Sequence, residues 1–291
     1  MAAFLVVIVG GVVLFALSGN KSPKSDKITY AATIFPVYDL AREIAGDRAE
    51  VRLILPQGAS PHTFEITPQV ASRVATSRVV FKIGIVDDWI DSVSGNKLYK
   101  VDKDIPFQKF EIKAFGEEAG SEGTGYDPHY WTIPSNAQIM ARNIYDRMVE
   151  TDPEGRNTYT ANYKKLDGDL ASLDNEIKQE LQPFAGEGLI TFHDAWGYFA
   201  SRYDLKIAAV LLSSPGKEIT PGNIKAVGDA ANYAHAKAVF YEPEFSRDVV
   251  DSFAKDYYLK TGILDAEGGM PGDTYISLMR RNVISIKDAL R

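Results

Sequence analysis

Strand-like and helix-like segments alternate twice along this chain, and a long helical stripe separates the two series. In the first series, runs rich in valine and isoleucine alternate with segments of helical periodicity from Ile28 to Ile83. The same alternation begins again at Leu189 and continues to Leu290. Because helices that connect successive strands place those strands parallel, each series predicts a doubly wound α/β sheet. We expect an α/β protein with two Rossmann-like lobes of similar make-up.

The expected elements can be placed on the sequence. In the first series the strands are 28–35, 51–55 and 79–83, and the helices are 37–45 and 68–77. In the second series the strands are 189–192, 206–212 and 238–241, and the helices are 196–202, 221–236, 246–260 and 273–290. The alternation breaks after about Tyr99. The polar stretch from Phe115 to Tyr126 has no periodicity, which predicts a loop.

The segment between the two series predicts one continuous helix. It opens with Asp152-Pro153-Glu154, a favourable helix start with an acid near the positive end of the helix dipole. Its apolar residues recur every three or four positions: Tyr159, Tyr163, Leu166, Leu170, Leu173, Ile177 and Leu181. A helix of about 28 residues would reach roughly 42 Å, the length of a two-lobed molecule. A coiled-coil dimerisation helix is the alternative, but the flanking lobes favour a rigid internal backbone helix in a monomer.

The chain of 291 residues is long enough for two domains, and 45% hydrophobic with 24% charged residues is ordinary for a soluble globular protein. We expect an N-terminal signal or anchor with its linker at 1–26 and a first lobe at 27–152. The linking helix follows at 153–182 and a second lobe at 183–291.

The first residues are expected to lie outside the fold. Residues 2–17 form an almost unbroken apolar run, and a polar linker containing Pro23 follows. About 16 apolar residues are short for the roughly 20 of a spanning helix and long for the core of a signal peptide, so an uncleaved anchor and an export signal both stay open. Either one places the chain from about Lys27 onward outside the cytoplasm. A buried core helix is a third, less favoured interpretation.

Three histidines and one aspartate recur at nearly even intervals, each after a stretch with the character of a buried strand. They are His62, His129, His193 and Asp265. Three imidazoles and a carboxylate form a complete tetrahedral ligand set for Zn²⁺. Because open α/β sheets bind ligands at the carboxyl ends of their strands, we expect two ligands from each lobe to meet in the inter-lobe cleft. The remaining histidine, His235, is expected at a helix C-terminus, where a cation is favourable, and is left out.

Composition narrows the choice of ligand and partner. The chain has no cysteine, so a metal must be held by nitrogen and oxygen, which suits zinc first and manganese second. Lysine and arginine total 32 against 39 acidic residues, a net charge of −7, and no basic run is present. Nucleic acid is therefore not expected as a partner.

The residues around these positions resemble the zinc and manganese solute-binding proteins of ABC-type metal importers, the metal-binding cluster A-I family. The resemblance covers nearly the whole chain from Ile28 to Leu290. It is carried by residues 58–65 (GASPHTFE), 127–131 (DPHYW), 192–199 (FHDAWGYF), 241–246 (YEPEFS), 264–265 (LD) and 273–279 (DTYISLM). The resemblance implies two (β/α) lobes joined by a backbone helix, a metal held by His62, His129, His193 and Asp265, and delivery of that metal to a membrane permease.

Two departures from the family pattern limit what is carried over. Zinc-dedicated members often have a long histidine-rich loop before the second ligand, whereas the stretch 115–126 is short, with three glutamates and no histidine. The lipid-attachment cysteine is also missing, which leaves residues 2–17 as the visible tether to a membrane. An adhesion role, sometimes attached to relatives, has no independent support in this sequence.

The type of ligand favours zinc over manganese. Manganese-selective relatives tend to place a second carboxylate at the third position, where this chain has His193, and nitrogen-rich four-coordinate sites favour Zn²⁺. A bidentate Asp265 would reopen the manganese alternative. Asp194 and Glu65 are candidates to orient the imidazoles by accepting their second N–H, and Glu242, an acid at a strand end, is a further candidate that is expected to face the cleft. Solvated or capping carboxylates are the alternative for each. The aromatic residues Trp131, Trp196 and Tyr198 are expected to wall the cleft or to pack in the core.

A zinc-dependent hydrolase is the alternative from another class, because hydrolytic zinc is held by three protein ligands with an open fourth position. Asp265 as a fourth ligand would close the site, and no nucleophile or general-base motif accompanies it. We therefore expect a binding protein and not an enzyme.

Overall fold

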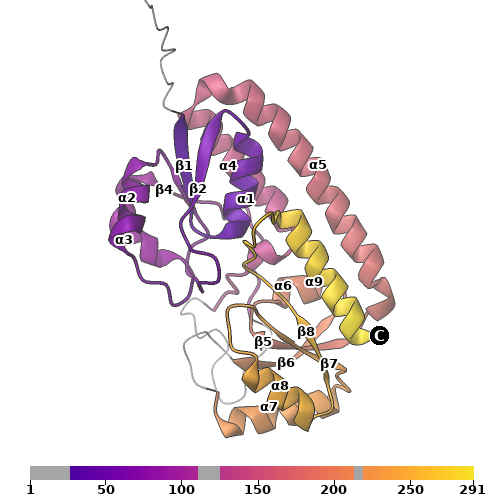
Figure 1. Ribbon diagram of the computed structural model, residues 1–291. Coiled ribbons are helices and arrows are strands. Elements are labelled where there is room, and N and C mark those ends of the chain that lie inside the picture. Colours follow the sequence, from indigo (N-terminus) through magenta and orange to yellow (C-terminus); the bar gives the residue numbers. More distant parts are fainter. Residues whose placement is uncertain (1–26, 111–124, 213–218) are drawn as a thin grey trace, which may run out of the picture.

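The computed structural model describes residues 27–110, 125–212 and 219–291 (Figure 1). The apolar run 2–17 and most of the expected loop 115–126 lie outside the described residues. Within the described part of the chain, no helix combines the length and the apolar character needed to cross a membrane. Two parallel sheets lie at opposite ends of the molecule, and one long helix, α5 (Arg156–Leu181), runs along the side of both.

The first lobe contains a four-stranded sheet in the order β2-β1-β3-β4. Its strands are β1 (Ile28–Ala32), β2 (Ala49–Leu53), β3 (Val80–Lys82) and β4 (Leu98–Lys100), and every pairing is parallel. The connecting helices are α1 (Phe35–Ala45), α2 (Pro68–Thr76) and α3 (Asp91–Ser94). Helix α1 ends at Gly46, whose φ of 51° is a left-handed conformation that glycine adopts without steric cost.

The second lobe repeats this topology in the order β6-β5-β7-β8, again with only parallel pairings. Its strands are β5 (Gly188–His193), β6 (Lys206–Leu212), β7 (Ala238–Tyr241) and β8 (Lys260–Ile263). Its helices are α6 (Gly197–Arg202), α7 (Pro221–Tyr233), α8 (Asp248–Asp256) and α9 (Tyr275–Leu290). The expectation of two doubly wound lobes is confirmed.

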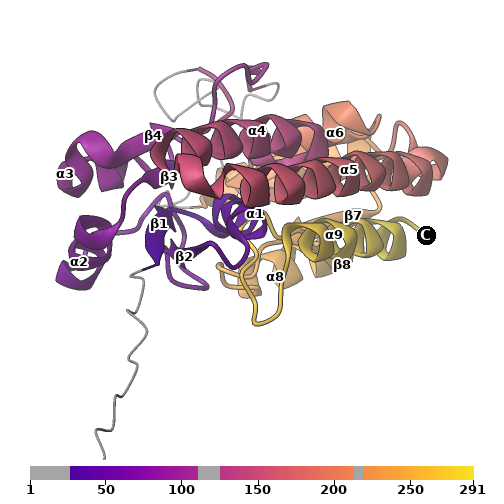
Figure 2. The ribbon, with the colours of Figure 1, turned by 90° about the horizontal axis from the view of Figure 1, so that it is seen from above.

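The long helix between the lobes forms as the apolar stripe predicts, after a 3-10 turn at Pro153–Gly155. Six of the seven stripe residues are buried, and Tyr163 is half-buried. Helix α5 contacts α1 and α4 (Pro134–Thr151) of the first lobe and α9 of the second, and Figure 2 shows α4, α5 and α9 running side by side. The ion pairs Arg280–Glu176 and Lys287–Glu180 join α9 to α5.

Several elements were not expected from the sequence or were misplaced, including the short helix α3 and strand β8. Helix α4 occupies a stretch where no element was expected, although its buried residues Ala137, Met140, Ala141, Ile144 and Met148 have helical spacing. Strand β4 was also not expected. The expected helix 246–260 is wrong at both ends, because α8 covers only Asp248–Asp256. Strand β8 begins at Lys260. Tyr258, with a φ of 57°, turns the chain between them.

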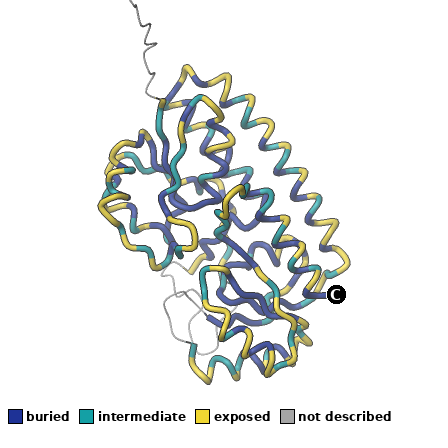
Figure 3. Tube along the Cα trace, in the orientation of Figure 1, coloured by how far each residue is buried: buried dark blue, intermediate teal, exposed yellow. Residues whose placement is uncertain are grey.

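One continuous apolar core joins the lobes. It includes Tyr30 of the first sheet, Leu170 of α5, Phe240 of β7 and Tyr275 of α9. Figure 3 shows the same arrangement as buried chain in both lobes, with the exposed positions of α5 facing outward. Because the lobes share a core, they are held in a fixed relation.

Candidate metal centre

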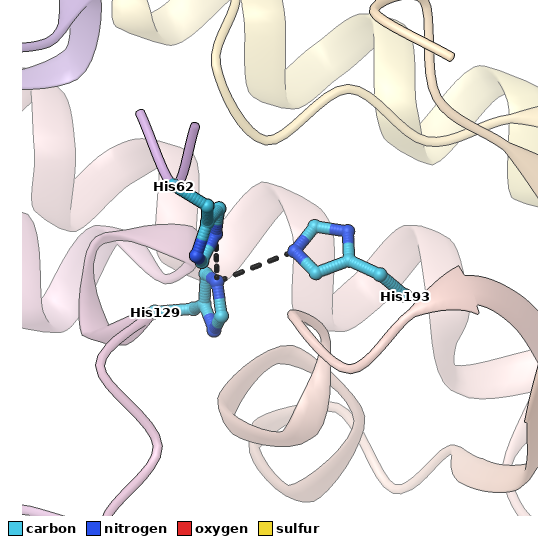
Figure 4. Close-up of side chains that lie close together, drawn as sticks. All are labelled: His62, His129 and His193. Carbon is cyan, nitrogen blue, oxygen red and sulfur yellow. Dashed lines mark hydrogen bonds between the residues drawn. The ribbon is translucent and has the colours of Figure 1, made fainter. Parts of the chain in front are cut away.

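Three histidines from distant parts of the chain meet between the lobes (Figure 4). His62 lies in the loop that follows β2, His129 directly precedes the 3-10 turn Tyr130–Thr132, and His193 is the last residue of β5. One ring nitrogen from each lies within 4.8 Å of the other two. Among the described residues these three histidines form the only such group of potential metal ligands.

The spacing of the ring nitrogens fits a tetrahedral metal ion. The Nε2 atom of His129 lies 3.3 Å from Nε2 of His62 and 3.3 Å from Nε2 of His193. Two nitrogens bound to zinc at about 2.0–2.1 Å with a tetrahedral angle lie roughly 3.3–3.4 Å apart. Two of the three nitrogen pairs are therefore at the separation that such an ion requires, and the nitrogens of His62 and His193 lie within 4.8 Å of each other.

Two carboxylates orient the rings from behind. Nδ1 of His129 donates to Asp127 Oδ1 at 2.8 Å, and Nδ1 of His193 donates to Glu242 Oε1 at 2.6 Å. A ring whose proton sits on Nδ1 presents the lone pair of Nε2, which is the form that binds a metal. Both rings thus direct a ligand atom toward the same region.

The surroundings of the histidines are rich in acids. Burial raises the pKa of Glu242 well above its ordinary value, while its contacts with His193 and His62 lower it. Burial and, after it, the charge of Glu242 raise the pKa of Glu244 to about 8, and burial raises that of Glu267 well above the normal range. Oε2 of Glu242 has no hydrogen-bond partner among the described residues. A cation bound beside these carboxyl groups would favour their charged forms.

Asp265 lies close to the end of β8, beside this acidic region, and is only 6% exposed. Its Oδ1 accepts hydrogen bonds from the backbone N–H groups of Glu267 and Gly268, at 3.1 and 2.7 Å. Its Oδ2 lies 3.5 Å from Nη2 of Arg281. The close group of ligand atoms among the described residues does not include Asp265.

The remaining site residues lie as follows. Glu242, which follows β7, contacts the imidazole of His193. Asp194 is half-buried next to His193, and Glu65 is exposed. His235 is exposed after α7, away from the group. Asp127 was not among the expected orienting acids, although its position two residues before His129 lets it accept from both the backbone N–H and Nδ1 of that histidine.

One expectation about the histidines is wrong. In the described residues before His129, 107–110 and 125–128, there is no strand but only an isolated bridge between Lys109 and Tyr126, and a 3-10 turn and α4 follow His129. His193 does end a strand, and His62 and Asp265 follow strands.

The three expected aromatic residues are all buried. The ring of Trp131 packs against His129 with centroids 5.1 Å apart, and Trp131 Nε1 donates to the carbonyl of Ala266 in the other lobe. The hydroxyl of Tyr198 donates to the carbonyl of Asp127. Trp131 and Tyr198 thereby support the segment that carries His129.

Comparison with known proteins finds one family whose model matches residues 31–289, described as "Zinc-uptake complex component A periplasmic" (ZnuA). The iron ABC transporter substrate-binding lipoprotein MtsA of Streptococcus pyogenes serotype M1 is 28% identical, over 100% of this chain and 97% of that protein. The high-affinity zinc uptake system protein ZnuA of Bacillus subtilis is 27% identical, over 98% and 97%.

Solved structures give the same fold. A mutant laminin-binding adhesin, Lmb, of Streptococcus agalactiae superposes with a TM-score of 0.80 at 24% identity, over 91% of this chain and 100% of that one. A zinc-bound ZnuA deletion mutant superposes with a TM-score of 0.78 at 24% identity, over 91% and 98%. At this identity the superpositions establish the arrangement of two lobes and a linking helix.

Proposed function

This chain belongs to the family of periplasmic zinc-uptake complex A components, and on that basis we propose that it captures Zn²⁺ between its lobes and delivers the ion to a membrane permease. Proteins of this family are metal-binding solute-binding components of ABC importers and not enzymes. The choice of zinc, the ligands and the attachment to the membrane are the proposed parts.

The convergence of His62, His129 and His193 carries the proposal. Nε2 separations of 3.3 Å match those of a tetrahedral ion, and Asp127 and Glu242 each accept from the Nδ1 of a histidine. Asp265, from the second lobe, is the proposed fourth ligand. Ligands from both lobes place the ion at the junction of the lobes, which the shared core holds in one arrangement.

The donor set favours zinc over manganese. Three nitrogens and one oxygen suit a four-coordinate Zn²⁺, and Mn²⁺ stands lowest in the intrinsic order of affinity. Oδ1 of Asp265 is engaged by two backbone N–H groups, which leaves Oδ2 as the oxygen available to a metal. A single oxygen from Asp265 keeps the coordination number low. Manganese is the alternative within the same importer class, and the relative from S. pyogenes is named for iron.

The same ligand set argues against a zinc-dependent hydrolase. Such enzymes keep one coordination position open for water, whereas Asp265 would close the site. Residues 2–17, outside the described part of the chain, are the proposed export signal or anchor that holds the protein at the outer face of the membrane. The adhesin named among the structural neighbours supports no more than a shared fold.

Zinc titration against a competing chelator tests the proposal on the protein and its His193→Ala and His129→Ala variants. Each variant should lose affinity by more than about a hundredfold, which exceeds the usual effect of removing an orienting partner. His235→Ala is the matched control, because His235 is exposed and distant from the group, and it should bind zinc as the unaltered protein does. Equal affinity of His193→Ala and His235→Ala would contradict the proposal.

A further inference from the structure

Both oxygens of Asp265 have partners supplied by the second lobe itself. The amides of Glu267 and Gly268 hold Oδ1, and Arg281 of α9 lies beside Oδ2. Asn282, the next residue of α9, fixes the backbone of Asp265 by accepting from its N–H at 2.9 Å and donating to its carbonyl at 2.8 Å. Two successive residues of one helix therefore control the position of Asp265 and the environment of its carboxylate.

Arg281 lies between two acids and interacts more closely with Asp273 than with Asp265. Its guanidinium binds Asp273 through two hydrogen bonds, Nη1 to Oδ1 at 2.6 Å and Nη2 to Oδ2 at 3.0 Å. Its Nη2 is 3.5 Å from Asp265 Oδ2, which is longer than the roughly 2.7–2.9 Å of a charge-assisted hydrogen bond. Asp273 thus holds the guanidinium close to Asp265 without a direct hydrogen bond between them.

We propose that Arg281 restrains Asp265 and competes with the metal for its Oδ2, so that it sets how tightly the fourth ligand closes the site. This inference rests on the proposed function, with Asp265 as a ligand. Arg281 acts through Asp265, so it is a positioning residue. Asp273 limits this competition because its carboxylate accepts two hydrogen bonds from the guanidinium.

When Asp265 binds the metal, its Oδ2 exchanges the guanidinium of Arg281 for the ion. For Oδ2 to bind the ion, it must give up its attraction to the guanidinium, and a fixed positive charge near a cation also opposes binding. Both effects weaken the complex and speed release. A carrier benefits from this, because an ion bound too tightly cannot be handed to a permease.

Arg281→Gln tests the inference, with Arg280→Gln as the matched control. Arg280 is the neighbouring arginine of α9 and pairs with Glu176 of α5, so both substitutions remove one positive charge from the same helix. Arg281→Gln should bind zinc about fivefold more tightly and release it more slowly to a chelator, as expected for an ion pair worth about 1 kcal/mol. Arg280→Gln should change the affinity by less than about twofold.

The second variant, Asp273→Asn, should change zinc affinity in the opposite direction. Without the charge of Asp273, Arg281 is free to close onto Asp265, so zinc binding should weaken. An Arg281→Gln affinity equal to that of Arg280→Gln, or a change of the same sign in Arg281→Gln and Asp273→Asn, would overturn the inference.

A double-substitution cycle with Asp265→Ala separates restraint from simple repulsion. If Arg281 acts mainly through Asp265, most of the gain in zinc affinity from Arg281→Gln is lost in the Asp265→Ala background. An undiminished gain in that background means charge repulsion alone and overturns the inference. Failure of the proposed function is recognised differently, because His193→Ala would then retain the affinity of the unaltered protein.

Discussion

At the scale of the residue, the acids behind the histidines distinguish this group from a chance meeting of imidazoles. Glu242 is 0% exposed, accepts from Nδ1 of His193, and has an oxygen without a hydrogen-bond partner in the described structure. A carboxyl buried in this way lowers the stability of the metal-free fold when it is charged. It is retained, in our account, because it makes His193 a better ligand.

Glu242→Gln should therefore lower zinc affinity without lowering the stability of the metal-free protein. Glutamine can still accept from His193 but lacks the negative charge, so zinc affinity should fall by roughly 10–100-fold. Because burial raises the pKa of Glu242, its charged form is disfavoured in the fold at neutral pH, and the metal-free variant should melt at the same or a higher temperature. Chelator competition and thermal melting check the two effects. Glu150→Gln, at an exposed site, is the control; a variant that loses stability but keeps its affinity would contradict this role.

The meeting of His62, His129 and His193 could be predicted from sequence because residue type and spacing carry that information. The role of Asp127 could not, because it depends on the compact turn that brings its carboxylate to both the backbone and the ring of His129. The engagement of Asp265 by Arg281 was also beyond prediction. Arg281 of α9 meets Asp265 of the loop after β8, and the spacing of residues along the sequence does not indicate such a contact between separate elements.

At the scale of the element, the strongly periodic segments were predictable and the weakly patterned ones were not. Helix α5 has one unbroken apolar stripe, whereas α4 buries the polar residues Asn136 and Asn143 among its apolar ones, which blurs its period. Asn143 donates to the carbonyls of Val101 and Lys103, so its burial is explained by a tertiary contact. Strand β8 has the sequence KTGI and packs at the sheet edge, where pairing with β7 decides its conformation.

The junction of α4 and α5 is held by a buried acid. Arg48 donates to both oxygens of Asp152 at 2.8 and 2.7 Å, and the hydroxyl of Tyr159 donates to Oδ2 at 2.7 Å. These contacts connect the start of the long helix to the turn before β2. The hydrogen bonds from Arg48 are the main cause that lowers the pKa of Asp152 to about 2.

The pH dependence of stability should reveal this junction. Because the folded-state pKa of Asp152 lies below the ordinary aspartate value of about 3.9, its contribution is present above that value and is lost as the pH falls toward about 2. Asp152→Asn should reduce the free energy of unfolding at pH 6 and flatten its decline between pH 5 and pH 2. Urea unfolding across that range measures both, with the exposed Asp146→Asn as control. Parallel pH profiles for Asp152→Asn and the unaltered protein would contradict the assignment.

At the scale of the whole molecule, several hydrogen bonds tie the lobes together beside the metal centre, among them three made by Trp131 and Tyr275. Trp131 Nε1 donates to the carbonyl of Ala266, the hydroxyl of Tyr275 donates to the carbonyl of Trp131, and the N–H of Tyr275 donates to Asp39 Oδ2. With the shared core and the length of α5, these contacts resist a wide hinge motion. We therefore expect metal binding to involve small local shifts, such as that of Asp265.

We propose that this two-lobed protein binds zinc through a site of three histidines and Asp265. Elemental analysis of the purified protein, after exposure to an equimolar mixture of zinc and manganese and removal of free metal, tests it most directly. We predict about one zinc per chain, little manganese, and loss of the zinc in His193→Ala. Manganese in equal or greater amount, or zinc retained by His193→Ala, would contradict the account.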